Sequence, residues 1–158
     1  MVALLVLLCT LTWMRSALYE NMMLLWQDTV KKSPNKARPH NNLGYVLKDK
    51  GNLDEALKHL ERSIQINPEY PEALNNLATI YSIQGRKMDA LALLQKAVAL
   101  GPELIDARYN LALLCYQLGL VEDAKREYTI ILQRWPYRDE AVFSRQMLFM
   151  IQAEDRRR

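Results

Sequence analysis

The chain reads NNLATIYSIQGRKMDALALLQKAVALGP over residues 75–102. Five residue types of this stretch recur at intervals of 34 residues through the 158-residue sequence. The recurring positions are Asn42, Asn76 and Asn110; Leu43, Leu77 and Leu111; Gly51, Gly85 and Gly119; Ala56, Ala90 and Ala124; and Pro34, Pro68, Pro102 and Pro136. A single packed domain does not need a fixed interval of this kind, so the sequence predicts a tandem repeat.

The glycine and the proline of each period predict two helices per repeat. Gly85 can adopt the positive φ that follows a first helix, and Pro102 lacks the N–H needed to continue a second one. Small residues that let two helices approach closely stand at Gly44, Ala78 and Ala112. Each unit then buries its apolar face only against its neighbours, as in a solenoid.

These residues and their spacing resemble the tetratricopeptide repeat family, whose 34-residue unit is a helix–turn–helix. The resemblance gives full repeats at residues 37–70, 71–104 and 105–138. It implies an all-α fold, a right-handed solenoid of antiparallel helix pairs. The sequence departs from the family pattern where a bulky aromatic is favoured early in each repeat, at His40, Leu74 and Arg108.

Composition and motifs argue against several classes of function. Hydrophobic residues make up 50% and charged residues 25% of the chain, and its net charge of +3 is too small to indicate nucleic acid binding. The basic tail at residues 154–158 is expected to be a solvated chain end. No phosphate loop, zinc-binding His pair or nucleophile motif occurs in the sequence, so we expect no enzyme activity.

Histidine and cysteine are too sparse for a metal site, so no cofactor and no metal are expected. Cys9 and Cys115 fit neither a metal-ligand spacing nor a disulfide framework. His40 occupies an early packing position of the first repeat, and His59 is expected on the outer side of a second helix.

Residues 1–16 form an apolar segment that we interpret as a membrane anchor. A helix of 14 residues reaches only about 21 Å, at ~1.5 Å per residue, against a hydrocarbon core of ~30 Å. Three alternatives stay open: a signal peptide without a clear cleavage site, a helix that continues through Leu18 with Arg15 at the interface, and a Met1 that is internal to a longer protein. The predicted location is the bacterial inner membrane, with the side of the repeats undecided.

Residues 17–36 are predicted to be a degenerate half repeat that ends at the proline phase. Leu25-Trp26, Ser33-Pro34 and Arg38 resemble the junction between the membrane domain and the repeats in mannosyltransferase-like or oligosaccharyltransferase-like multipass proteins. That resemblance implies an alternative function, a detached repeat tail that recruits acceptor protein to a glycosyltransferase-like membrane enzyme. A third alternative is an assembly scaffold whose apolar N-terminus packs against a partner subunit.

Residues 139–153 are predicted to form a capping helix over the last repeat. Val142, Met147, Met150 and Ile151 are expected to close its core. The run Met147-Leu148-Phe149-Met150-Ile151 is too apolar for one helical face, so a homodimer formed through this helix is an open alternative.

The family resemblance places the binding surface on the concave face of the first helices, where extended peptides are held. The matching candidate residues are Asn41, Asn42, Tyr45, Asn75, Asn76, Thr79, Ser82, Tyr109, Asn110, Leu113 and Tyr116. A ladder of Asn42, Asn76 and Asn110 can pair with a peptide backbone, because an amide is both donor and acceptor. The alternative is that these asparagines hydrogen-bond between repeats and fix their geometry.

These observations predict a non-catalytic module held at a membrane through residues 1–16, with a protein or peptide as its partner. The carboxylate clamp of chaperone-tail binders is not expected, since only Asn76 agrees with it. Weak affinity is expected from three hydrogen bonds at ~0.5–1.5 kcal/mol each, so the tyrosines would have to add apolar contact.

Overall fold

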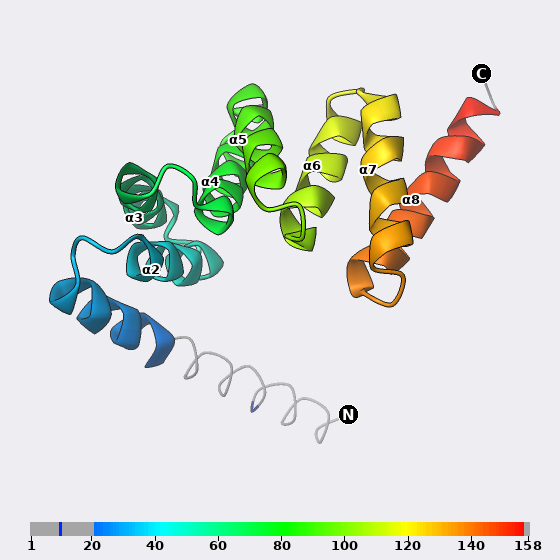
Figure 1. The fold of residues 1–158 in the computed structure, drawn as a ribbon. Helices are drawn as coiled ribbons and strands as arrows, with labels where there is room; N and C mark the ends of the chain where they lie inside the picture. Colours follow the sequence, from blue (N-terminus) through cyan, green and yellow to red (C-terminus); the bar gives the residue numbers. More distant parts are fainter. Residues whose placement is uncertain (1–9, 11–20, 157–158) are drawn as a thin grey trace. The chain divides into compact units, whose positions relative to one another are not determined.

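The computed structural model describes Thr10 and residues 21–156. All the regular structure in this part of the chain is helical, as predicted. The chain divides into two compact units, Met1–Pro68 and Glu69–Arg158. Figure 1 shows the helices in each.

The first unit contains a helix over residues 21–32, followed by α2 (Ala37–Asp49) and α3 (Leu53–Ile66). Val46 and Leu47 on α2 and Leu60 on α3 are fully buried. Gly44 lies so close to α3 that an added Cβ would stand 2.7 Å from Leu60 Cγ. The small residue is therefore required for the close packing of α2 against α3.

The second unit contains α4 (Pro71–Ile83), α5 (Lys87–Leu100), α6 (Ile105–Gln117), α7 (Val121–Arg134) and α8 (Asp139–Asp155). Each helix packs on the next one, and α6 also contacts both α4 and α8. The core of this unit includes Leu94 of α5, Tyr128 and Ile131 of α7, and Ile151 of α8. The second unit is therefore a stack of helices in which each helix pair buries its apolar face against the neighbouring pair.

The three helix pairs repeat without drift. First helices begin at Ala37, Pro71 and Ile105, and second helices begin at Leu53, Lys87 and Val121, each 34 residues after the last. The turn glycines have φ of +82° (Gly51), +79° (Gly85) and +76° (Gly119), as the sequence predicts. This left-handed conformation costs an L-residue about 1–2 kcal/mol, which explains why glycine recurs there.

The C-terminal helix α8 packs against α6 and α7, but the residues it buries there differ in part from those that the sequence predicts. Ala141, Ser144 and Ile151 are buried, and Met147 is half-buried. Val142 is 50% and Met150 is 45% exposed, so the prediction that these two close the core is wrong. The helix turns Ala141 and Ser144 inward because α8 lies close to α6 and α7, where small side chains fit.

The prediction of a membrane location is overturned. Within the part of the chain that the structure describes, no helix is both long enough and apolar enough to cross a membrane. The proposed anchor, residues 1–16, lies outside the described residues apart from Thr10, and so do residues 17–20 of the half repeat.

Candidate functional site

A pocket of about 130 Å³ lies between α4, α5 and α6 of the second unit. Thr79, Ser82 and Ile83 line it from α4, and Asn110, Leu113 and Gln117 from α6. Leu94 of α5 forms part of its floor, where it is almost fully buried. The residues that line this pocket are apolar or uncharged polar. The structure thus gathers Thr79, Ser82, Asn110 and Leu113, four of the predicted candidates, in one depression.

Asn110 is held in this pocket by a neighbouring repeat. Its Nδ2 donates a 2.9 Å hydrogen bond to Oδ1 of Asn75 on α4. The bond joins first helices of successive repeats, which is the structural role that the sequence left open for the asparagines. An amide carries two N–H donors and an acceptor oxygen, so Asn110 keeps capacity for a ligand.

Tyr109 and Tyr116 lie toward α8 and do not line this pocket. The Tyr109 ring packs edge-on against Tyr128, with centroids 6.2 Å apart, and at a tilt against Phe143, with centroids 6.4 Å apart. The Tyr116 hydroxyl donates to a carboxylate oxygen of Glu154, at 3.2 Å. Burial, with a contribution from Glu140, raises the pKa of Tyr109. Both tyrosines therefore contribute to the contact between α6 and α8.

In the first unit, the candidates lie on α2. Asn41 is buried and donates a 3.1 Å hydrogen bond to Oδ1 of Asn42, which is half-buried. Tyr45 is 41% exposed, with the Lys48 ammonium 4.8 Å from its ring centroid. In the second unit, Asn76 is buried on α4. Of the three ladder asparagines, Asn76 is therefore buried while Asn42 and Asn110 are half-buried, although they share one phase of the repeat.

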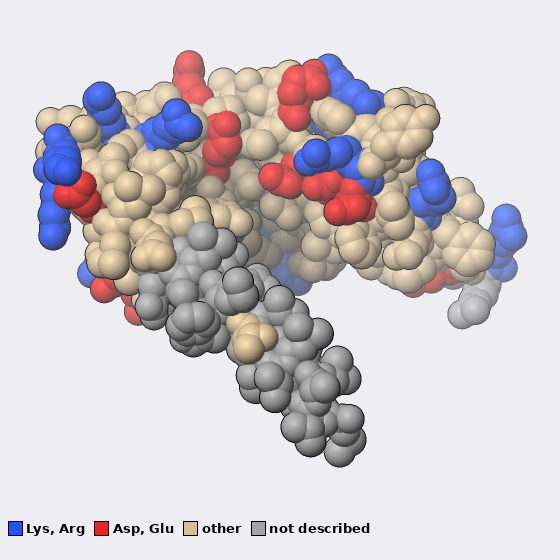
Figure 2. Space-filling view, turned by 90° about the horizontal axis from the view of Figure 1, so that it is seen from below, with Lys and Arg blue, Asp and Glu red and all other residues tan. Residues whose placement is uncertain are grey.

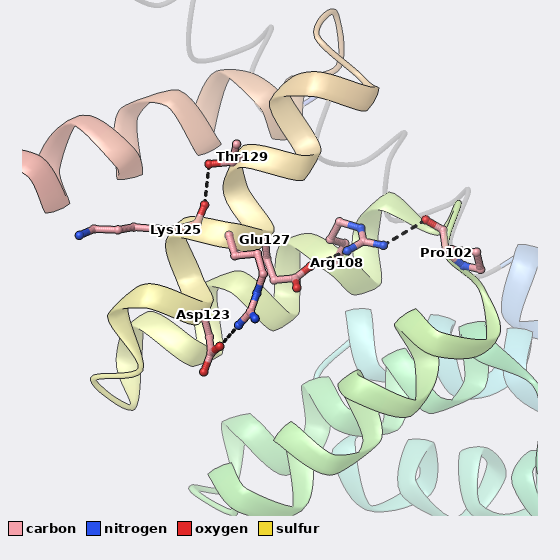
Figure 3. Close-up of polar contacts among 7 residues, drawn as sticks. Pro102, Arg108, Asp123, Lys125, Glu127 and Thr129 are labelled. Carbon is pink, nitrogen blue, oxygen red and sulfur yellow. Dashed lines mark hydrogen bonds and ion pairs between the residues drawn. The ribbon is translucent and has the colours of Figure 1, made fainter.

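The third repeat holds a buried ion pair that the sequence did not predict. Nη1 of Arg108 on α6 lies 2.5 Å from Oε2 of Glu127 on α7, and the two side chains are 8% and 14% exposed. Nη2 of Arg108 also donates to the carbonyl oxygen of Pro102, at 3.5 Å. Figure 3 shows Arg108 between these two acceptors. The two residues are 19 apart in the sequence, and no motif marks that separation as an ion pair.

The first repeat has a histidine pair at the same two positions. Nδ1 of His40 on α2 lies 3.0 Å from Nδ1 of His59 on α3. The prediction that His59 lies on the outer side of its helix is wrong, because its ring is half-buried against that of His40. Sixty-eight residues separate His40 from Arg108 and His59 from Glu127, which is twice the repeat length.

Charges of both signs are mixed on one face of the described part of the chain. Figure 2 shows a face on which Lys and Arg side chains lie interspersed with Asp and Glu. Among the described residues, no group of three or more His, Cys, Asp or Glu side chains is placed to hold a metal ion.

Two family models match the chain, and both are described as the tetratricopeptide repeat. They cover residues 35–103 and 76–139. Residues 35–139 therefore belong to the tetratricopeptide repeat family. Repeats of this kind are typically non-catalytic interaction scaffolds, and neither family model describes an enzyme. Comparison with curated protein sequences found no match.

Solved tetratricopeptide repeat proteins share this fold. The protein TTC0263 of Thermus thermophilus is 23% identical with a TM-score of 0.72, over 87% of this chain and 77% of that one. YrrB, described as having an unusual peptide-binding site, is 18% identical with a TM-score of 0.71, over 82% and 66%. The first repeat domain of Spaghetti, solved with the HSP90 peptide SRMEEVD, is 24% identical with a TM-score of 0.68, over 75% and 92%.

These comparisons support the repeats but not the predicted junction with a membrane enzyme. Both matching family models begin after residue 34, and neither describes a mannosyltransferase-like or oligosaccharyltransferase-like protein. The resemblance of Leu25-Trp26, Ser33-Pro34 and Arg38 to such a junction therefore has no support from the matched families.

Proposed function

We propose that this chain binds an extended peptide on the first helices of its second unit, α4 and α6, with an uncharged, apolar side chain of the peptide in the pocket between α4, α5 and α6. The observation that carries the proposal is that pocket, which Thr79, Asn110 and Leu113 line together. Two proteins of the same fold, YrrB and Spaghetti, are described with peptide sites.

The chemistry of the pocket limits its occupant. Its volume of about 130 Å³ is close to the ~150 Å³ of an engineered cavity that binds benzene, so a branched aliphatic or small aromatic side chain is of suitable size. Charged side chains are disfavoured because burial of an unpaired charge is costly. The amide of Asn110 and the hydroxyls of Thr79 and Ser82 can pair with peptide backbone groups at the rim.

The remaining candidates belong to separate sets in the two units, and Asn41, Asn75 and Asn76 among them are largely buried. Asn75 and Asn76 belong to α4 beside the pocket residues, and Asn41, Asn42 and Tyr45 form a corresponding set on α2. Tyr109 and Tyr116 add aromatic area on α6 next to α8. Affinity is modest in this proposal, because each net hydrogen bond contributes only ~0.5–1.5 kcal/mol.

The test uses peptides selected from a random library against the unmodified chain, with affinities measured by fluorescence anisotropy. Leu113→Arg places a charge in the pocket and is expected to weaken binding by tenfold or more. Gln95→Arg, which adds the same charge at an exposed position of α5, is the matched control and is expected to leave binding unchanged. Failure to select any peptide, or equal affinities for both variants, would overturn the proposal.

A further inference from the structure

We propose that His40 and His59 form a proton-binding pair that weakens the packing of α2 against α3 as the solution becomes acidic. The two rings stack at a tilt, with centroids 5.3 Å apart, and their Nδ1 atoms are 3.0 Å apart. His40 is only 7% exposed. The pair affects the stability of the first repeat and does not depend on the proposed peptide site.

The hydrogen bonds fix which nitrogens carry protons at neutral pH. Nε2 of His40 lies 3.0 Å from the carbonyl oxygen of Pro34, which can only accept, so Nε2 must donate. A neutral His40 then presents a bare Nδ1 to its partner. His59 must donate from its own Nδ1, and the pair holds two protons on these atoms, Nε2 of His40 and Nδ1 of His59.

The first and the second proton that the pair takes up from solvent have different effects. The first can bind Nε2 of His59, since that nitrogen is outside the hydrogen bond, and the bond between the rings survives. The second must bind Nδ1 of His40, where the hydrogen bond from His59 already lies. Both Nδ1 atoms, 3.0 Å apart, would then be donors on two cations, and the hydrogen bond between α2 and α3 would be lost.

The surroundings resist even the first proton. Burial lowers the pKa of His59 most, His40 lowers it further, and only the Glu55 carboxylate on α3 raises it. In the unfolded chain His59 takes up a proton near pH 6.5, before it does so in the folded chain. A folded pKa below the unfolded value means that stability is full above about pH 6.5 and is lost as the pH falls below it.

The other repeats suggest a control variant without imidazole, because they have other residues at the two positions of His40 and His59. The second has Leu74 and Leu93, and the third has Arg108 and Glu127. His40→Leu with His59→Leu therefore copies a pair that this fold already accepts, and it removes both titrating groups.

The experiment is hydrogen exchange with mass spectrometry on the full chain between pH 7.5 and 5.0, corrected for the intrinsic pH dependence of exchange. In the unmodified chain, the equilibrium constant for opening of α2 and α3 is expected to rise as the pH falls below ~6.5. For each proton that the open form binds in excess of the closed form, the rise is about tenfold per pH unit. In the double-leucine variant this rise should be absent. Equal slopes in the two proteins would overturn the proposal.

A second measurement on the unmodified chain covers the case in which the double variant does not fold. Nitrogen chemical shifts of the two imidazoles are expected to show Nε2–H on His40 and Nδ1–H on His59 at pH 7.5. His59 should titrate below its ordinary pKa. Titration of His59 at or above its ordinary pKa, with the helices unperturbed, would contradict the proposal.

Discussion

Arg108 on α6 and Glu127 on α7 form a buried ion pair at the two repeat positions that hold His40 and His59 in the first repeat. Arg108 and His40 also each lie within hydrogen-bond reach of the carbonyl oxygen of the proline six residues earlier, Pro102 and Pro34. One structural position thus accepts three chemistries, a cation with a carboxylate, two imidazoles, and two leucines. The three repeats place these two positions alike along their helices, while the two side chains differ together from one repeat to the next.

The ion pair should behave as a unit in mutagenesis. Arg108→Leu or Glu127→Leu alone leaves one buried charge without its partner, and each is expected to lower the free energy of unfolding by about 3–5 kcal/mol. The double substitution, which reproduces the Leu74 and Leu93 pair, should be near neutral or stabilising. Urea denaturation of the three variants measures this, and additive losses in the double variant would contradict it.

Asn75 and Asn110 should show energetic coupling. Asn110→Ala removes the donor to Asn75, a buried acceptor, and is expected to cost about 1–3 kcal/mol. A double-mutant cycle with Asn75→Ala should give a coupling free energy of ~0.5–1.5 kcal/mol, measured by denaturation without any peptide. A coupling near zero would show that this bond does not stabilise the repeats in solution.

Gly85 should tolerate asparagine better than alanine. An added Cβ meets nothing within 4 Å, so the cost of substitution comes from the backbone alone, where φ is +79°. Gly85→Ala is expected to lower stability by about 1–2 kcal/mol, and Gly85→Asn by less, because asparagine visits the left-handed region more readily. Thermal unfolding would rank the variants, and equal losses for both would contradict this explanation.

Removing the hydroxyl of Tyr128 should not destabilise the second unit. The residue is fully buried, and its hydroxyl has no hydrogen-bond partner among the described protein groups. Burial also raises the pKa of this hydroxyl well above its ordinary value, so it stays neutral. Tyr128→Phe is therefore expected to be neutral or stabilising, by up to about 1 kcal/mol, in urea denaturation. A clear loss of stability would indicate that the hydroxyl is satisfied in solution.

The repeat and its helices could be predicted from the amino-acid order alone. The 34-residue interval of prolines and glycines marks the positions of the turns, because only glycine adopts positive φ cheaply and proline cannot continue a helix. Small residues such as Gly44 and Ala78 indicate the close approach of first and second helices. These features are local, so they can be recognised without knowing which helices pack together.

The pairing of side chains between helices became visible only in the folded chain. The fold places His59 against His40, turns Tyr109 and Tyr116 toward α8, and joins Asn110 to Asn75. It also buries Ala141 and Ser144 of α8 in place of Val142 and Met150. Such contacts depend on the rotation of each helix about its axis and on the neighbour it meets, which a periodic sequence pattern leaves free.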